Sequence, residues 1–141
     1  MRSRLGLIVG VGLVLPGCIG APDPQPSTQT CTSTDSRVGQ VGTFRTLFHG
    51  VSGTARIVDD CTISIEHFNY DGGGLDVRVY GGRDSTFRDA VILSSDLRRP
   101  GGYRDETLTV RLPDGVTLDD VRAIAIWCVV VDVNFGDAVF P

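Results

Sequence analysis

The sequence predicts an all-β fold, either an antiparallel β-sandwich or a barrel-like single domain. Apolar residues alternate with polar ones in several short runs, as they do in strands that bury one face. Segments rich in Gly, Asp and Pro separate these runs and have the composition of β-turns. Only residues 117–121 have a helical pattern, with Thr117 as the N-cap. Short strands without a long helix are typical of sandwiches and barrels.

Residues 1–17 are predicted to be a signal peptide rather than part of the fold. A short basic head containing Arg2 and Arg4 precedes an apolar run over residues 5–15. This run is too short to span a bilayer, which requires about 20 residues, but it suits the core of a signal peptide.

The segment Leu15-Pro16-Gly17-Cys18 resembles the lipobox of bacterial lipoproteins, in which the peptide is cut before an acylated cysteine. We therefore expect Cys18 to carry diacylglycerol and palmitate chains that anchor the mature protein to a bacterial membrane. The alternative is an ordinary secretory signal with a chance cysteine. Because Ile19 replaces the Asp that favours inner-membrane retention, the outer membrane is the expected address in a Gram-negative cell.

Residues 19–37 contain three prolines, many Ser and Thr residues and almost no apolar side chains. This composition predicts a disordered tether that lifts the domain away from the membrane. The expected organisation is a signal peptide over residues 1–17, the lipidated cysteine and tether over residues 18–38, and a β domain over residues 39–141.

The expected strands follow the tether in order and are separated by turns. The turn-like segments are residues 58–62, 70–76, 80–84, 98–103 and 112–115. Between them, the alternating apolar positions that we expect in the core are Ile57, Ile63, Ile65, Val77, Val79, Leu108, Val110 and Leu112.

The last expected strand runs over residues 123–135 and is the most apolar part of the domain. On an unbroken strand, the side that contains Trp127 is apolar throughout and is expected to face the core. The side that contains Cys128 begins apolar and becomes polar at Asp132. Cys128 should therefore lie near the boundary between a covered and an open region.

Three cysteines remain after Cys18, so pairing leaves one of them over. Thiols outside the cytoplasm tend to pair. Cys31 lies in the tether and Cys61 in a turn, and we expect these two accessible residues to form a disulfide. Cys128 then remains free, as a buried core residue or as a reactive thiol. The alternative is a disulfide between Cys128 and Cys61 or Cys31.

A reactive thiol requires positive charge or a metal nearby to stabilise the thiolate. Arg104 and Arg122 are the candidates for this charge.

The charge of the chain excludes some classes of function. It contains 15 Asp, 2 Glu and no Lys, and its formal charge of −4 becomes −6 when Arg2 and Arg4 are removed. Nucleic acid is therefore not an expected partner, since phosphate binding requires a basic surface. A hydrolytic enzyme is also not expected, because there are two Glu, two His and no Gly-x-Ser-x-Gly motif.

Aspartates at 71, 76, 132 and 137 are residue types that bind calcium, but they lack EF-hand spacing. Asp and Gly are also favoured in β-turns for backbone reasons. We therefore predict no metal site.

Residues 39–141 resemble the DM-thirteen domain of animal Skeletor- and Knickkopf-type proteins and of bacterial secreted proteins. The resemblance rests on motifs that occur in the family's order. They are Gly42-Thr43-Phe44, His49, Gly53, the Phe-x-Tyr-Asp-Gly element of residues 68–72, Leu-Pro-Asp-Gly at 112–115, Trp127-Cys128 and Phe135-Gly136. Leu75 departs from the pattern, because the family often has proline there.

The resemblance implies an all-β extracellular domain whose Trp-Cys cysteine has been proposed to perform redox chemistry or to hold a prosthetic group such as haem. This role falls on Cys128, with Trp127 packed beside it and His49 as a helper or cofactor ligand. Covalent c-type haem is excluded because Cys-x-x-Cys-His is absent. The mature chain also contains no Met, so the available axial ligands are Cys128, His49 and His67.

The sequence therefore predicts an extracytoplasmic lipoprotein with a redox or electron-transfer role centred on Cys128. Its partner would be an unknown redox or cell-surface protein. The alternative is a non-catalytic interaction or adhesion module in which Cys128 is structural.

Overall fold

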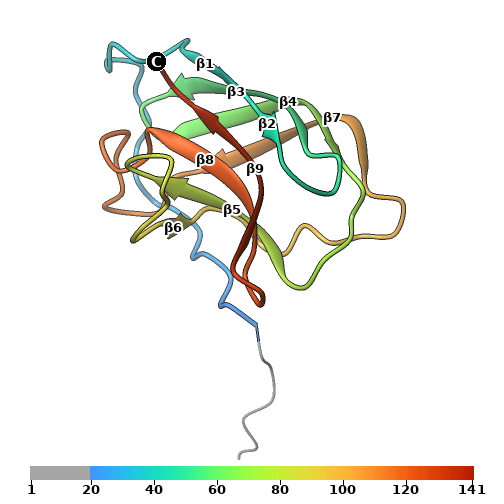
Figure 1. Ribbon diagram of the computed structural model, residues 1–141. Coiled ribbons are helices and arrows are strands. Elements are labelled where there is room, and N and C mark those ends of the chain that lie inside the picture. Colours follow the sequence, from blue (N-terminus) through green and yellow to red (C-terminus); the bar gives the residue numbers. More distant parts are fainter. Residues whose placement is uncertain (1–19) are drawn as a thin grey trace, which may run out of the picture.

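The computed structural model describes residues 20–141 and is a sandwich of two antiparallel sheets that are not closed into a barrel (Figure 1). This confirms the predicted all-β class. One sheet has the strand order β1-β3-β4-β7, and the other has the order β2-β9-β8-β5-β6. The strands are β1 (Val41–Thr43), β2 (Arg45–Thr46), β3 (Ser52–Asp59), β4 (Thr62–Tyr70), β5 (Val77–Gly82), β6 (Val91–Ile92), β7 (Tyr103–Arg111), β8 (Ala123–Cys128) and β9 (Val133–Val139).

The described residues include no helix that is long and apolar enough to cross a membrane. Residues 117–121 contain a single turn that begins at Thr117. In this turn the Asp120 amide donates to the Thr117 carbonyl, and the Thr117 hydroxyl accepts a hydrogen bond from the Asp119 amide.

The core lies between the sheets and contains most of the alternating positions that the sequence predicts. Ile57 on β3, Ile63 and Ile65 on β4, and Val77 and Val79 on β5 are each at most 1% exposed. Because side chains alternate between the two faces of a strand, these positions point inward together.

The first two strands are one extended segment that passes from one sheet to the other. β1 pairs with β3, and β2 pairs with β9 on the opposite sheet. Phe44 lies at the crossing and is buried, with its amide donating to the Gly53 carbonyl. A Cβ at Gly42 would lie 2.6 Å from the Val139 carbonyl oxygen, so only glycine allows this close approach between the edges of the two sheets.

The prediction for residues 123–135 is wrong in two respects. The segment is not one strand, because β8 ends at Cys128 and residues 129–132 turn the chain into β9. The inward face is also the opposite one. Ile124, Ile126 and Cys128 point into the core, whereas Trp127 lies on the outer face of the sheet.

The pairing with β5 accounts for this orientation. Val77 is opposite Cys128, so the buried side chains of β5 and β8 share one face. Trp127 is apolar but is covered on the outer face by Tyr80 and Phe87, with ring centroids 5.6 and 5.9 Å away. Its indole N–H donates to Asp132 across the turn.

The expected tether takes a different form in the structure. Residues 20–38, here called the strap, contain no helix or strand, but they lie against the sandwich through many hydrogen bonds. Near its start, the buried Arg78 donates to the carbonyls of Ala21 and Pro22 and to the carboxylate of Asp23. Asp76 accepts the amide of Ala21.

Two further carboxylates hold the rest of the strap. Asp114 accepts hydrogen bonds from the amides of Thr28 and Gln29 and from the hydroxyls of Ser27 and Thr28. Asp60 similarly accepts hydrogen bonds from Thr32, Thr34 and Asp35. The strap is ordered by polar contacts with a few individual residues of the domain. Its own polar composition therefore does not predict this order.

The predicted disulfide between Cys31 and Cys61 is confirmed and fastens the strap to the β3–β4 turn. The Cα atoms are 5.4 Å apart, within the usual range for a disulfide. Cys61 is 3% exposed. It is therefore buried, whereas the sequence predicts an accessible residue. The disulfide also accounts for the cluster of Cys31, Asp59 and Cys61, whose ligand atoms lie close together.

Replacing both Cys31 and Cys61 with Ser should lower the free energy of unfolding by about 3–4 kcal/mol. The bridge closes a loop with a sequence separation of 30, and chain entropy gives it a stabilisation of about that size. Urea unfolding of the oxidised mature chain and the double variant measures the difference. Equal midpoints and slopes for the two proteins would contradict a stabilising role.

Acid should release the middle of the strap before the sandwich unfolds. Hydrogen bonds from Thr28, from Ser27 and from the Gln29 amide lower the pKa of Asp114 from 3.8 to about 2. A carboxylate with a lowered pKa contributes its stabilisation above pH 3.8, and this contribution is lost as the pH falls toward 2. Hydrogen exchange at the Thr28 and Gln29 amides should therefore lose protection between about pH 4 and pH 2.

Asp114→Asn provides the control for this acid effect. The amide side chain does not ionise, so protection at Thr28 and Gln29 should be weaker at neutral pH and should change little with acid. An acid transition of the same size in this variant would show that another group is responsible.

Candidate functional site

The thiol of Cys128 is buried at the end of β8 and is 1% exposed. Its Sγ donates to the Leu75 carbonyl over 3.1 Å and accepts the Leu75 amide over 3.3 Å. It is the free cysteine among the residues that the structure describes. The sulfur therefore lies beneath a single backbone segment, and that segment separates it from solvent.

This covering segment is the glycine-rich connection between β4 and β5, here called the cover loop (residues 71–76). Leu75 is 51% exposed, so one residue separates the sulfur from the surface. Gly74 has a φ of +106°, and a Cβ there would lie 2.8 Å from Val77 and 3.0 Å from the Phe135 ring. Glycine is required because the loop packs closely on the core in a left-handed conformation.

His49 lies at the other end of the cover loop. Its Nδ1 is 2.9 Å from an Asp71 carboxylate oxygen, and its ring lies 4.2 Å from that of Phe135, centroid to centroid. Asp71 also accepts the Gly73 amide. Partial burial acts to raise the pKa of Asp71, but the hydrogen bonds from Gly73 and His49 outweigh it and leave the pKa below its usual value.

A cluster of aromatic rings fills the core below His49 and the cover loop. Tyr70 and Tyr103 are stacked with their centroids 6.0 Å apart, and Tyr70 is 6.4 Å from Phe135. The Tyr70 hydroxyl donates to the Gly73 carbonyl. Burial, followed by the nearby charges of Asp71 and Asp96, raises the pKa of Tyr70. The phenol therefore stays protonated and remains a donor to the cover loop.

The structure separates Trp127 from Cys128, although the two are adjacent in sequence. Trp127 lies outside the sheet with Tyr80 and Phe87, whereas Cys128 lies inside it. Trp127 therefore does not pack against the sulfur, and the strand backbone lies between them.

The two arginines that the sequence suggests as thiolate partners lie elsewhere. Arg122 precedes β8, six residues before Cys128 and roughly 20 Å away along an extended strand. Arg104 lines a cavity of about 330 Å³ together with His49, Tyr70 and Tyr103, and Cys128 does not line it. Within the described chain, the hydrogen bonds of the thiol are those to Leu75.

The donor set does not fit a haem in this conformation. The Cys128 sulfur is already occupied by the Leu75 backbone, and the cavity at His49 does not extend to it. His67 lies on β4 with its side chain 76% exposed beside Asp105, away from Cys128 and the cavity at His49. The three candidate ligands therefore do not converge on one space.

The four aspartates that the sequence offers for calcium have separate partners. Asp71 pairs with His49, Asp76 with Arg78, and Asp137 with Arg45. Asp132 accepts the Trp127 indole. Each therefore holds a different turn or strand.

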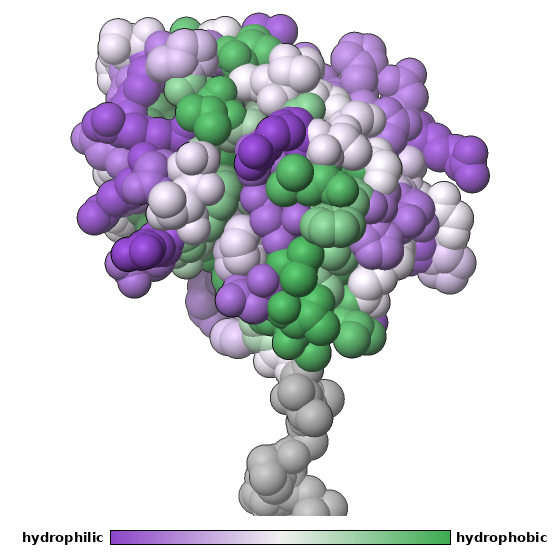
Figure 2. Space-filling model, in the orientation of Figure 1, coloured by the Kyte–Doolittle hydropathy of each residue, from purple (hydrophilic) through white to green (hydrophobic). Residues whose placement is uncertain are grey.

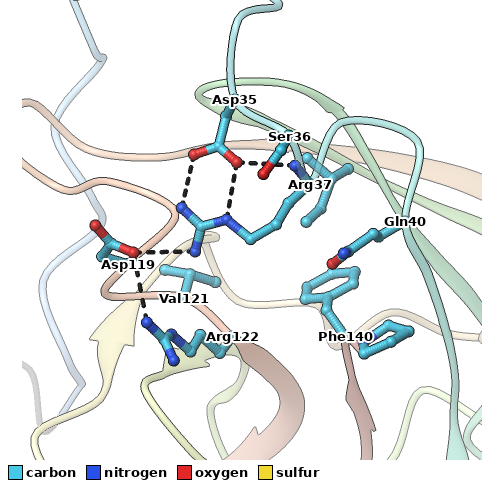
Figure 3. A pocket seen from close by; sticks show the side chains of 10 residues that line it. Asp35, Ser36, Arg37, Gln40, Asp119, Val121, Arg122 and Phe140 are labelled. Carbon is cyan, nitrogen blue, oxygen red and sulfur yellow. Dashed lines mark hydrogen bonds and ion pairs between the residues drawn. The ribbon is translucent and has the colours of Figure 1, made fainter.

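A larger cavity, of about 520 Å³, lies at the opposite end of β8 from Cys128 (Figure 3). The Arg37 guanidinium pairs with Asp35 in it and donates to the Leu118 carbonyl, so its charge is already neutralised. Gln40 Oε1 is buried and has no hydrogen-bond partner within the described chain. This cavity joins the end of the strap to the sandwich, and of the predicted site residues it contains only Arg122.

Comparison with known protein families shows to which family the chain belongs. The family described as Electron transfer DM13 matches residues 43–140, which include the aromatic cluster, the cover loop and Cys128. The chain belongs to the DM13 family. This confirms the resemblance that the sequence motifs indicate.

Relatives of this DM13 chain occur as parts of much longer proteins. Protein Skeletor of Drosophila melanogaster, isoforms B/C, is 37% identical over 110 residues, covering 72% of this chain and 14% of its own length. Isoforms D/E match equally well over 7% of their length. A cytochrome b561, DM13 and DOMON domain-containing protein of Arabidopsis thaliana is 26% identical over 112 residues, or 77% of this chain and 12% of its own. No solved structure matches the chain.

The sequence predicts Cys128 and His49 as site residues, but it does not point to the residues that surround the thiol and the cover loop. Leu75 covers the sulfur through its backbone, so its side-chain type gave no signal. Tyr70 belongs to the Phe-x-Tyr-Asp-Gly motif, and in this chain its hydroxyl donates to the Gly73 carbonyl of the cover loop. Arg78 alternates with buried valines on β5, a pattern typical of an exposed side chain, but it is only 4% exposed.

Cys128→Ala should lower the free energy of unfolding by about 1–2 kcal/mol, because it leaves a small cavity and two unmet hydrogen bonds at Leu75. Cys128→Ser retains a donor and an acceptor and should cost less than about 2 kcal/mol. Urea unfolding of both variants measures this. Unchanged stability in Cys128→Ala would contradict the packed position of the sulfur.

Proposed function

We propose that this chain is a lipid-anchored, extracytoplasmic DM13 domain that transfers electrons through the thiol of Cys128. The observation that carries the proposal is that Cys128 remains a free thiol although the other two described cysteines form a disulfide, and that both hydrogen bonds of its sulfur go to the cover loop. Membership of a family described as Electron transfer DM13 supports a redox role.

The proposed chemistry is thiol–disulfide exchange with a partner disulfide. When the cover loop opens, the Cys128 thiol loses its proton to solvent and the thiolate attacks one sulfur of the partner. The partner's S–S bond breaks, a mixed disulfide forms, and the other partner sulfur leaves as a thiolate. A donor thiolate then attacks the Cys128 sulfur of the mixed disulfide, and the bound partner sulfur leaves as its second thiolate. A second donor thiolate attacks the donor sulfur of the new mixed disulfide, which releases the Cys128 thiolate and leaves a donor disulfide. Two electrons pass from the donor thiols to the acceptor disulfide.

His49 acts in this proposal as a positioning residue and not as a ligand. Its imidazole holds the Asp71 carboxylate, and that carboxylate holds the Gly73 amide at the start of the cover loop. The Tyr70 hydroxyl holds the Gly73 carbonyl from below. Breaking the His49–Asp71 contact would loosen the loop and admit a partner.

The proposed location rests on the N-terminal sequence and the disulfide. The basic head, the short apolar run and Leu15-Pro16-Gly17-Cys18 support acylation of Cys18. These residues lie outside the described part of the structure. The Cys31–Cys61 bridge supports an oxidising compartment. A bacterial membrane, the outer one in a Gram-negative cell, is the proposed site.

A non-catalytic interaction module remains the second candidate. The burial of Cys128 and its two satisfied hydrogen bonds favour it, because free cysteine is often an inert core residue. In that case the strands and loops would bind a cell-surface partner, and the thiol would not react with a disulfide.

Reaction with glutathione disulfide separates these two functions. In the mature chain with Cys31–Cys61 oxidised, Cys128 should form a mixed disulfide faster than global unfolding allows, because the cover loop opens locally. Gly74→Ala should increase this rate several-fold, since its Cβ would contact Val77 and Phe135 and displace the loop. Mass spectrometry of the peptide containing Cys128 measures the rate.

Gly115→Ala is the matched control. It introduces the same methyl group at a φ of +81°, but nothing lies within 4 Å of it and it is outside the cover loop. Its exchange rate should remain that of the wild type. Exchange at the global unfolding rate in all three proteins would show that Cys128 is structural and would favour the interaction module.

A further inference from the structure

Three large apolar side chains are exposed together at one end of the sandwich. Leu75, Val130 and Val131 are 51%, 50% and 52% exposed. The cover loop and the β8–β9 turn that carry them are joined, since the Val129 amide donates to the Asp76 carbonyl and Leu75 bonds to Cys128. Figure 2 shows hydrophobic surface at the lower end of the molecule, where this turn lies in Figure 1. We call these three residues the apolar end.

The described chain begins beside this apolar end. The Ala21 amide donates to Asp76 over 2.9 Å, and a Cβ on Gly20 would lie 3.7 Å from the same carboxylate. Asp76 is adjacent to Leu75 in sequence and contacts Val129 through its carbonyl. Gly20 is thus held against the two segments that form the apolar end.

The proposed anchor is close to this point. Cys18 precedes Gly20 by two residues, and two residues of extended chain span at most about 7 Å. The residues after Gly20 do not increase the distance between Cys18 and the domain, because Arg78, Asp114 and the disulfide hold the strap along the sandwich. A lipid surface that holds Cys18 would therefore meet the domain near its apolar end.

We propose that Leu75, Val130 and Val131 dock the domain directly onto the lipid surface that holds its anchor. This inference rests on the acylation of Cys18 in the proposed function. Apolar side chains at an interface bury their surface among headgroups and the first acyl carbons. The three docking residues carry no charge, so the contact depends on apolar burial and is insensitive to salt.

The docked orientation has a consequence for Cys128. Leu75 contributes both backbone hydrogen bonds to the thiol, and its side chain belongs to the apolar end. The covered thiol therefore faces the membrane side of the domain. A partner that reaches Cys128 approaches along the lipid surface.

Spin labels at two matched valines test the docking. Val131→Cys and Val139→Cys, each in a Cys128→Ser background, place a nitroxide at the two ends of the β8–β9 hairpin. The native side chains are 52% and 50% exposed, and roughly 26 Å of strand separates them. The acylated full-length protein is reconstituted in vesicles of phosphatidylethanolamine and phosphatidylglycerol. Collision with oxygen, relative to a water-soluble nickel complex, reports on lipid contact.

We expect the label at position 131 to show a several-fold higher oxygen-to-nickel ratio than the label at 139. Adding Leu75→Asp should lower the value at 131 toward that at 139, because a charged group does not enter the interface. Leu75 is half exposed, so this substitution leaves the core intact. High salt should leave the ratio at 131 unchanged.

Intact mass is measured first and separates the two proposals. An unacylated mature chain would overturn both the anchor and the docking that depends on it. An acylated chain with both labels in water would overturn docking alone. A label at 131 shielded from oxygen and nickel alike would show that protein, a second copy or another partner, covers the apolar end, and this too would overturn docking on lipid.

Discussion

The buried ion pair between Arg78 and Asp76 holds together the cover loop, the start of the strap and the β8–β9 turn, and the rest of the structure depends on it. The Arg78 Nε is 2.6 Å from Asp76 Oδ1, and both side chains are nearly inaccessible. Burying a guanidinium without partners has a large free-energy cost. Arg78 also donates hydrogen bonds to the carbonyls of Ala21 and Pro22, which reduce this cost. Burial acts against the charge, but the hydrogen bonds that Arg78 donates to Asp76 and Asp23 outweigh it and raise the pKa of Arg78.

This pair joins three segments that are distant in sequence. Asp76 ends the cover loop, accepts the start of the strap and, through its carbonyl, holds the β8–β9 turn. Its φ of +49° places it in a left-handed conformation that non-glycine residues adopt only where surrounding contacts enforce it. Loss of either partner would leave an unpaired charge and would loosen the strap, the loop and the turn together.

The fold class and the disulfide could be predicted because each depends on a simple pattern. Period-two alternation identified Ile57, Ile63 and Ile65 as core residues, and three cysteines with two in accessible segments favoured the Cys31–Cys61 bridge. The orientation of β8 could not be predicted in this way, because both of its faces are apolar. The outer face is covered by Tyr80 and Phe87, which come from other parts of the chain.

The order of the strap and the contacts that cover the thiol could not be predicted from the sequence, for a related reason. The strap has a disordered composition, and its order comes from Arg78, Asp60 and Asp114, which lie far away in sequence. The cover of Cys128 consists of the Leu75 amide and carbonyl, which every residue except proline offers. Side-chain patterns contain no information about such contacts.

The strap also imposes an order on how the chain matures. Residues 20–38 are synthesised before Arg78, Asp114 and Leu118, which hold them in the folded protein. During synthesis the segment has nothing to bind and behaves as the loose tether that its composition suggests. It becomes a fixed part of the molecule only after the sandwich has formed. The strap would thus be mobile during folding and fixed once the sandwich has formed, and its docking would be the last step of folding.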